Sequence, residues 1–113
     1  MTEIRGTSHL SSVQQQTLRE DLRDQLERRS RQLLGLQAAA QDGSGADDTW
    51  QELVVSLTAA DRAIAELTQA LDRIATGSYG LCAHCGSGIP FERLKIRPLA
   101  RYCITCQRRQ EVA

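Results

Sequence analysis

The sequence Cys82-Ala-His-Cys85 and, seventeen residues later, Cys103-Ile-Thr-Cys106 contain all four cysteines of this 113-residue chain. Two residues between paired sulfurs let one tight turn present both thiolates to the same ion, and two such pairs complete a tetrahedral shell. Gly86 follows the first pair directly, and glycine lets the backbone fold back over a metal because it takes positive φ readily. The spacing therefore predicts one structural zinc ion bound by Cys82, Cys85, Cys103 and Cys106.

Three alternatives compete with a zinc ion bound by four cysteines. Two disulfides require an oxidising compartment, and nothing in residues 1–10 resembles an export signal. A thioredoxin-type redox pair requires a Cys-x-x-Cys at a strand-to-helix junction, and neither pair follows a strand-like run. His84 could replace a thiolate in principle. Because four cysteines already fill the shell, His84 is expected to face solvent.

Charge is divided unevenly along a chain whose formal net charge is zero. Residues 1–81 carry 8 basic and 12 acidic side chains (net −4), and residues 82–113 carry 6 and 2 (net +4). The six basic residues fit two interpretations, a nucleic-acid-binding surface or compensation of the negative centre that four thiolates form with Zn²⁺. They are Arg93, Lys95, Arg97, Arg101, Arg108 and Arg109.

The spacing of apolar residues predicts two long helices before the cysteines. Ser11 or Ser12 can cap the first helix, with Gln14 or Gln15 in the capping-box position. Its apolar residues then recur at intervals of three, four or seven up to about residue 41: Leu18, Leu22, Leu26, Leu33, Leu36 and Ala40. In the second helix intervals of 3 and 4 alternate without a break until Gly77 ends it: Trp50, Leu53, Leu57, Ala60, Ile64, Leu67, Leu71 and Ile74.

The stretch Asp42-Gly-Ser-Gly-Ala-Asp47-Asp48 separates the two helices. Glycine, serine and aspartate favour a turn here, and Asp48 is the expected N-cap of the second helix. Two helices joined by a short loop run antiparallel, and each is on the order of 45 Å long. Residues 11–77 are therefore expected to form an antiparallel coiled-coil hairpin with an acidic tip loop at 42–48. Trp50 is expected to pack in the seam, and contact with a partner at the tip is the alternative.

Residues 78–113 are expected to form a small four-cysteine zinc-finger module. Residues 86–91 read as a turn, and residues 93–98 alternate basic and apolar side chains, which favours a short extended segment. Ile104 to Val112 is expected to be a short C-terminal helix that carries Cys106. The fold class is thus mainly α. Residues 1–10 are expected to be a flexible N-terminus with neither a signal peptide nor a membrane span, so a cytoplasmic protein is expected.

The module resembles the zinc finger of the TraR/DksA family of bacterial transcription regulators. The resemblance lies in Tyr79-Gly-Leu-Cys-Ala-His-Cys-Gly86, Ile89-Pro90, Arg93-Leu-Lys-Ile-Arg-Pro98 and Tyr102-Cys-Ile-Thr-Cys-Gln-Arg-Arg109. It implies a protein that binds RNA polymerase directly and not promoter DNA. It also implies that the hairpin enters the secondary channel and that its acidic tip, Asp42, Asp47 and Asp48, lies near the catalytic magnesium.

Two features depart from the family's pattern. The tip lacks the Asp-x-x-Asp-x-Ala spacing of the family's best-studied members. The positions at which some members bind the alarmone ppGpp with basic residues are occupied by Ala59, Glu66 and Gln107. No ppGpp dependence is therefore expected.

An enzymatic function is not expected, because the sequence shows no nucleophile and base pair and no glycine-rich phosphate loop, and the zinc shell is full. The leading hypothesis is a monomeric, polymerase-binding regulator without sequence-specific DNA binding. A nucleic-acid-binding zinc ribbon that uses the six basic residues is one alternative. A thiol-based zinc redox sensor is the other.

Overall fold

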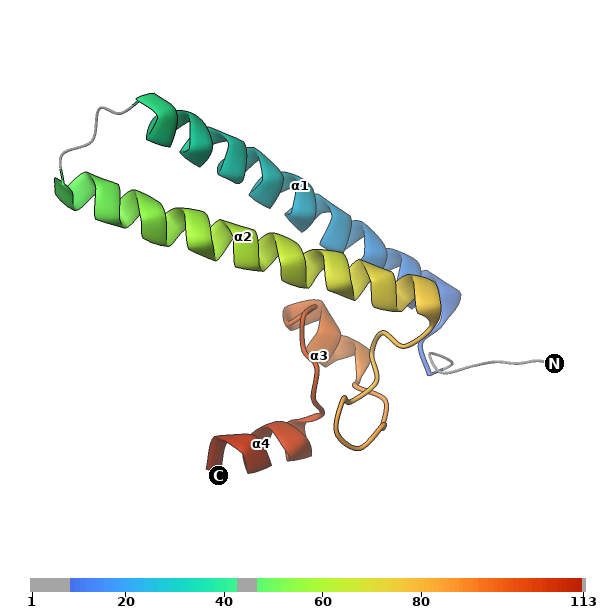
Figure 1. Cartoon of the computed structure of the whole chain (residues 1–113). Coiled ribbons are helices and arrows are strands. Elements are labelled where there is room, and N and C mark those ends of the chain that lie inside the picture. The colour runs from blue at the N-terminus through green and yellow to red at the C-terminus, as the bar shows by residue number, and fades with distance from the viewer. Residues whose placement is uncertain (1–8, 43–46, 113) are drawn as a thin grey trace.

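The computed structural model describes residues 9–42 and 47–112, except the side chains of residues 42, 47–49 and 112. The described residues form four helices: α1 Ser12–Asp42, α2 Asp47–Thr76, α3 Phe91–Ile96 and α4 Ile104–Val112. Helices α1 and α2 run antiparallel, α3 lies against the base of this hairpin, and α4 lies beyond α3 (Figure 1). The molecule is elongated, with extents of 59 × 33 × 20 Å. The predicted mainly α fold, with a hairpin and a short C-terminal helix, is confirmed.

The ends of the hairpin helices follow the local sequence signals. The Ser11 hydroxyl accepts a hydrogen bond from the Gln14 amide, and the Gln14 side chain accepts one from the Ser11 amide, both at 3.0 Å. This reciprocal pair is a capping box. At the end of α2, Gly77 has φ +88°, and the amides of Gly77 and Ser78 both donate to the Arg73 carbonyl at 2.9 Å. The predicted glycine stop is confirmed.

The hydrophobic core lies at the base of the hairpin, where α1, α2 and the zinc module meet. Its buried members are Leu10, Leu18, Leu22, Leu67, Ala70, Ile74, Tyr79, Ile89 and Leu94. In the half nearer the tip the seam is only half-buried, and no described residue from 23 to 42 or 50 to 59 is fully buried. Because the zinc module supplies part of the core, it anchors the hairpin at one end.

The start of α2 differs from the sequence-based expectation. The helix begins at Asp47, so Asp48 lies within its first turn and is not the N-cap. Trp50, expected in the seam, is 49% exposed. Residues so close to the open end of a two-helix hairpin have little surrounding chain to cover them.

Residues 93–98 were expected to be extended, and this prediction was wrong for most of them. Residues 91–96 form α3, whose first turn closes when the amides of Arg93 and Leu94 donate to the Pro90 carbonyl at 3.1 Å. A helix places Phe91 and Leu94 on one face, three residues apart. Leu94 is fully buried and Phe91 packs against the core. Burial of this pair favours the helix over the extended alternative.

The prediction of a flexible N-terminus needs correction at its last two positions. Leu10 is 4% exposed and belongs to the core, and the His9 ring is hydrogen-bonded to the zinc module. Residues 1–8 lie outside the described part of the chain. Among the helices that the structure describes, none combines the length and the apolar character needed to cross a membrane.

Candidate metal centre

The first cysteine pair lies on a tight turn between residues 80 and 89. The Ile89 amide donates to the Gly80 carbonyl and the Cys82 amide to the Ser87 carbonyl, both at 2.7 Å. Gly86, at φ +79°, reverses the chain, and its amide donates to the Cys82 carbonyl at 2.9 Å. Positive φ strains residues with a Cβ. The turn that carries Cys82 and Cys85 therefore depends on glycine, as the sequence predicted.

The second pair lies at the start of α4. Cys103 directly precedes the helix, its carbonyl accepts from the Gln107 amide at 2.9 Å, and Cys106 follows within the first turn. The Ala83 amide donates to the Arg101 carbonyl at 2.7 Å and so connects the two cysteine-bearing segments. The prediction that a short helix carries Cys106 is confirmed.

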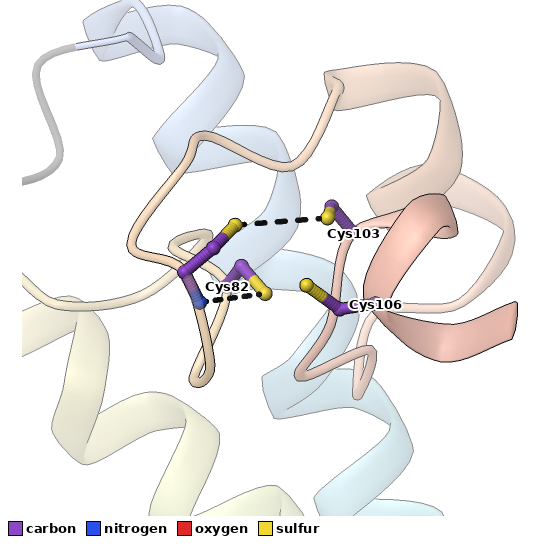
Figure 2. A group of neighbouring side chains, drawn as sticks. Cys82, Cys103 and Cys106 are labelled. Atoms are coloured by element: carbon purple, nitrogen blue, oxygen red, sulfur yellow. Dashed lines mark hydrogen bonds between the residues drawn. The ribbon is translucent and has the colours of Figure 1, made fainter. Parts of the chain in front are cut away.

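The four sulfurs converge on one point. All four lie within 4.8 Å of one another, and Figure 2 shows Cys82, Cys103 and Cys106 around a common centre. The Sγ atoms of Cys85 and Cys103 are 3.8 Å apart. A tetrahedral Zn–S bond of about 2.3 Å requires sulfurs about 3.8 Å apart. The site therefore fits one zinc ion, which is the cofactor of this C4 zinc finger.

The surroundings of Cys82 and Cys85 lower the pKa of both thiols and so favour the thiolate form that binds a metal cation. Burial alone raises the pKa of Cys82, but hydrogen bonds from the backbone of Cys85, Cys103 and His84 outweigh it and lower the pKa to about 5. The Ser87 hydroxyl, 3.2 Å from the Cys85 sulfur, is the main cause that lowers the pKa of Cys85. Amides and hydroxyls that stabilise a thiolate also hold it in place for the metal.

The pKa of the buried Cys106 is shifted in the opposite direction. Burial, and then the neighbouring thiols, raise its pKa to about 12. Zinc binding must therefore displace a proton from this sulfur, since only the thiolate is a metal ligand. His84 is exposed, as predicted. With four cysteines as ligands, the site has no open coordination position and its role is structural.

The six basic residues have different immediate surroundings. Arg93, Arg97 and Arg101 line a cavity of about 420 Å³ together with Gln25 of α1 and Gln107 of α4. Of the other three, the Lys95 Nζ atom is 5.8 Å from the centroid of the Phe91 ring, Arg108 is exposed, and Arg109 borders a hollow beside His84 and Cys106.

Arg101 also acts on an arginine of the hairpin. Burial, followed by the charge of Arg101, lowers the pKa of Arg73 on α2. Arg73 and Arg101 line a second hollow together with Glu66.

The three tip aspartates lie at the far end of the hairpin from the cysteines. Asp42 is the last residue of α1, and Asp47 and Asp48 begin α2. Figure 1 places these helix ends opposite the zinc module. The positions of the three side chains, and residues 43–46 between the helices, lie outside the described part of the structure.

Sequence reasoning missed two residues that support the metal centre. Tyr79 is 2% exposed, and its hydroxyl donates to the Pro98 carbonyl at 2.8 Å, which joins the end of α2 to the segment before Cys103. His9 joins the chain before α1 to Ile89. Neither residue has a spacing signal, because each contact depends on the fold that brings distant segments together.

The zinc module is similar in sequence to proteins of a known zinc-finger family. Residues 77–112 match the prokaryotic dksA/traR C4-type zinc finger. An uncharacterized protein of Aquifex aeolicus is 40% identical over 57 residues, which cover 50% of this chain and 39% of that protein. The RNA polymerase-binding transcription factor DksA of Caulobacter vibrioides is 42% identical over 48 residues, 42% of this chain and 34% of that protein. The matches thus span well under half of either relative.

A solved structure extends the similarity to the hairpin. Transcription factor DksA2 from Pseudomonas aeruginosa superposes with a TM-score of 0.82 at 27% sequence identity. The superposition covers 89% of this chain and 85% of DksA2. The similarity therefore includes the placement of the hairpin on the zinc finger.

Proposed function

The chain belongs to the DksA/TraR family, and on that premise we propose that it regulates transcription by binding RNA polymerase directly. The relative from Caulobacter vibrioides is named for RNA polymerase binding. The observation that carries the proposal is the DksA2-like arrangement of a long hairpin on a zinc finger, with a TM-score of 0.82.

The elongated shape of the molecule supports separate roles for its two ends. The zinc module and the core lie at one end, and the helix ends that carry Asp42, Asp47 and Asp48 lie at the other. In a molecule 59 Å long, the tip can reach a recessed site while the base stays outside. We propose that the base docks at the secondary channel and that the acidic tip enters it toward the catalytic magnesium.

The same features favour a binding role over catalysis. The metal shell is complete with four cysteines, so the zinc cannot activate water. Three of the six basic residues, Arg93, Arg97 and Arg101, line a cavity together with Gln25 and Gln107, and the name of the relative from Caulobacter vibrioides favours a protein partner over DNA. We therefore propose a monomeric binding protein that is not an enzyme and does not recognise a DNA sequence.

Independence from ppGpp is part of the proposal. Ala59, Glu66 and Gln107 supply no positive charge at the family's alarmone positions. Gln107 does, however, border the cavity lined by Arg93, Arg97 and Arg101. The test of the proposed function should therefore include ppGpp.

The test measures binding of the purified zinc-loaded protein to core RNA polymerase by fluorescence anisotropy, followed by transcription assays with and without ppGpp. We expect saturable binding, displacement by a purified DksA, altered transcript yield at a sensitive promoter and no added effect of ppGpp. Absence of binding at micromolar concentrations would refute the proposal. Binding that DksA cannot displace would refute docking at the secondary channel.

A further inference from the structure

The four cysteines of the metal centre differ in their access to solvent. Cys82 and Cys106 are buried, with 3% and 4% of their surface exposed. Cys103 is partly buried, and Cys85 is the exposed member of the set. Because one buried cysteine comes from each Cys-x-x-Cys pair, each pair contributes one sulfur that solvent does not reach. Molecules in solution therefore meet the centre first at Cys85.

The turn around Cys85 does not depend on the Cys85 sulfur. The Gly86 amide donates to the Cys82 carbonyl at 2.9 Å, and the Cys82 amide donates to the Ser87 carbonyl at 2.7 Å. Both hydrogen bonds close the turn through the backbone alone. The Cys85 side chain can therefore rotate away from a metal ion while the turn that carries Cys82 stays folded.

Ser87 restrains the Cys85 sulfur. Its hydroxyl oxygen lies 3.2 Å from that sulfur, and its backbone also contributes a hydrogen bond to it. A zinc-bound thiolate has no proton, so the hydroxyl must be the donor. Among the hydrogen bonds that the described residues make to the four sulfurs, this is the one made by a hydroxyl. Because the Ser87 carbonyl is held by the Cys82 amide, the position of the hydroxyl is restricted.

Hydrogen bonds of this kind affect how firmly a metal ion is held. Loss of a residue that hydrogen-bonds to a metal ligand typically costs about 10- to 100-fold in metal affinity. At Cys82 and Cys106 the surrounding chain also keeps competing ligands away. Cys85 lacks this protection. The hydrogen bonds from Ser87 are therefore what opposes displacement of its sulfur.

We propose that Cys85 is the first ligand to dissociate when the module exchanges zinc, and that Ser87 is a positioning residue that slows this step. When a thiolate or nitrogen ligand from solution enters, its bond to zinc forms as the Zn–S bond of Cys85 breaks. The freed Cys85 thiolate takes a proton from water, and no electron is transferred. One exposed side chain thus sets the rate at which this zinc finger loses or gains its ion. The proposal does not depend on polymerase binding.

The first experiment follows zinc transfer from the zinc-loaded protein to an excess of the chromogenic chelator pyridylazoresorcinol. Ser87→Ala keeps the backbone contacts and removes only the hydroxyl, so we expect transfer about tenfold faster. Ser87→Thr supplies a hydroxyl again and should return the rate to near the wild-type value. Thr105→Val is the matched control, since Thr105 lies between Cys103 and Cys106 and its hydroxyl makes none of the described hydrogen bonds to sulfur.

The second experiment replaces zinc with Co²⁺ and records the thiolate-to-metal charge-transfer bands. A hydrogen bond lowers the energy of the sulfur lone pairs, so its loss in Ser87→Ala should shift these bands to longer wavelength. Ser87→Thr and Thr105→Val should match the wild-type spectrum. Melting temperatures of all variants should equal that of the wild-type protein, because Ser87 and Thr105 are exposed.

The third experiment determines which ligand is released first. The zinc-loaded protein is treated briefly with a substoichiometric amount of iodoacetamide, and the modified cysteine is identified by peptide mass spectrometry. Modification should appear first at Cys85. Ser87→Ala should accelerate modification at Cys85 more than at the other three cysteines.

Each part of the proposal has an outcome that would overturn it. Equal transfer rates for the wild-type protein and Ser87→Ala, or a Ser87→Thr variant as fast as Ser87→Ala, would exclude the role of the hydroxyl. A lower melting temperature of Ser87→Ala with an unshifted cobalt spectrum would assign Ser87 a purely structural role. First modification at Cys82, Cys103 or Cys106 would overturn the assignment of Cys85.

Discussion

The Nε2 atom of His9 lies 2.8 Å from the carbonyl oxygen of Ile89, a residue 80 positions later in the chain. The carbonyl can only accept, so the imidazole N–H donates. The His9 ring also covers Gly88, where an added Cβ would lie 2.8 Å from the ring. The next residue, Leu10, is buried in the core. The segment before α1 is therefore part of the support of the zinc module.

This contact predicts coupling between His9 and Gly88. His9→Ala should lower stability by about 1 kcal/mol, since it removes one hydrogen bond and the ring contact. Gly88→Ala should also destabilise the wild-type protein, because its methyl group collides with the ring, but much less in a His9→Ala background. Thermal melts of the two single variants and the double variant give the coupling energy. Strict additivity would show that the two residues do not touch, and His84→Ala, at an exposed histidine, is the neutral control.

The base of the hairpin should determine its stability. Leu67 is 1% exposed and lies in the core shared with the zinc module, so Leu67→Ala should cost about 2–5 kcal/mol. Leu34 on α1 is 66% exposed, and Leu34→Ala should change stability by no more than about 0.5 kcal/mol. Chemical denaturation followed by circular dichroism measures both. Similar losses from the two substitutions would contradict the observed position of the core.

The hairpin could be predicted from sequence because its signals are local. The capping box at Ser11, the leucine spacing and the glycine stop at Gly77 each involve residues within a few turns of one another. The same reasoning failed at residues 93–98, because six residues of alternating pattern fit a strand and a single helical turn equally well. The burial of Leu94 against the hairpin decides between them, and that contact is not visible in the local pattern.

The metal ligands could be predicted for a different reason. Two cysteines separated by two residues are typical of zinc ligands, and this chain contains two such pairs. The spacing alone therefore predicts that all four cysteines bind one ion. The supporting contacts made by His9 and Tyr79 could not be predicted, since any exposed loop can contain a histidine and any core a tyrosine. Nor could the sequence show that Arg93, Arg97 and Arg101 line one cavity.

Loss of one zinc ligand should unfold the module before it unfolds the hairpin. A structural zinc site contributes about 10–16 kcal/mol of apparent binding free energy, so Cys103→Ser should lose the metal and the near-ultraviolet signal. Far-ultraviolet helicity should fall by much less than half, because most helical residues belong to α1 and α2. The hairpin that remains should melt at a lower temperature, since the module supplies Tyr79, Ile89 and Leu94 to its core. A Cys103→Ser protein with a full complement of zinc would contradict the assignment.

The buried tyrosine should make stability depend on alkaline pH. Burial is the main cause that raises the pKa of Tyr79 from 10.0 to about 12. The folded protein therefore holds this proton more tightly than the unfolded chain. The resulting stabilisation is fully present below about pH 10 and is lost as pH rises toward 12, a change of roughly 2–3 kcal/mol.

Ultraviolet titration can test this directly. In a Tyr102→Phe variant, Tyr79 is the one remaining tyrosine of the chain, and its phenolate absorbance should appear only near pH 12 or on unfolding. Ionisation near pH 10 in the folded protein would contradict the burial. Tyr79→Phe should remove the pH dependence and leave the Pro98 carbonyl without its hydrogen bond, at a cost of about 1 kcal/mol.

The acidic tip should affect function without affecting the fold. The ends of α1 and α2 that carry Asp42, Asp47 and Asp48 lie far from the zinc and the core, so their charges cannot support either. A carboxylate in the first turn of α2 interacts favourably with the helix dipole, but by only about 0.3–1 kcal/mol. Asp47→Asn keeps the size of the side chain and removes its charge. If the tip acts near the catalytic magnesium, this variant should bind polymerase with unchanged affinity and alter transcription much less than the wild-type protein does.

Asp48→Asn is the matched comparison for Asp47→Asn, because both residues lie in the first turn of α2 and lose the same charge next to the same dipole. An effect of the dipole alone would therefore change both variants equally, whereas contact with the magnesium, its water or a basic loop depends on direction and should separate them. Polymerase affinity and transcript yield at one sensitive promoter are measured for the wild-type protein and both variants. Unchanged transcription by both variants, with binding intact, would exclude a role for charge at these two positions. Regulation would then have to come from Asp42 or from simple occlusion of the channel by the hairpin, and Asp42→Asn distinguishes these two possibilities.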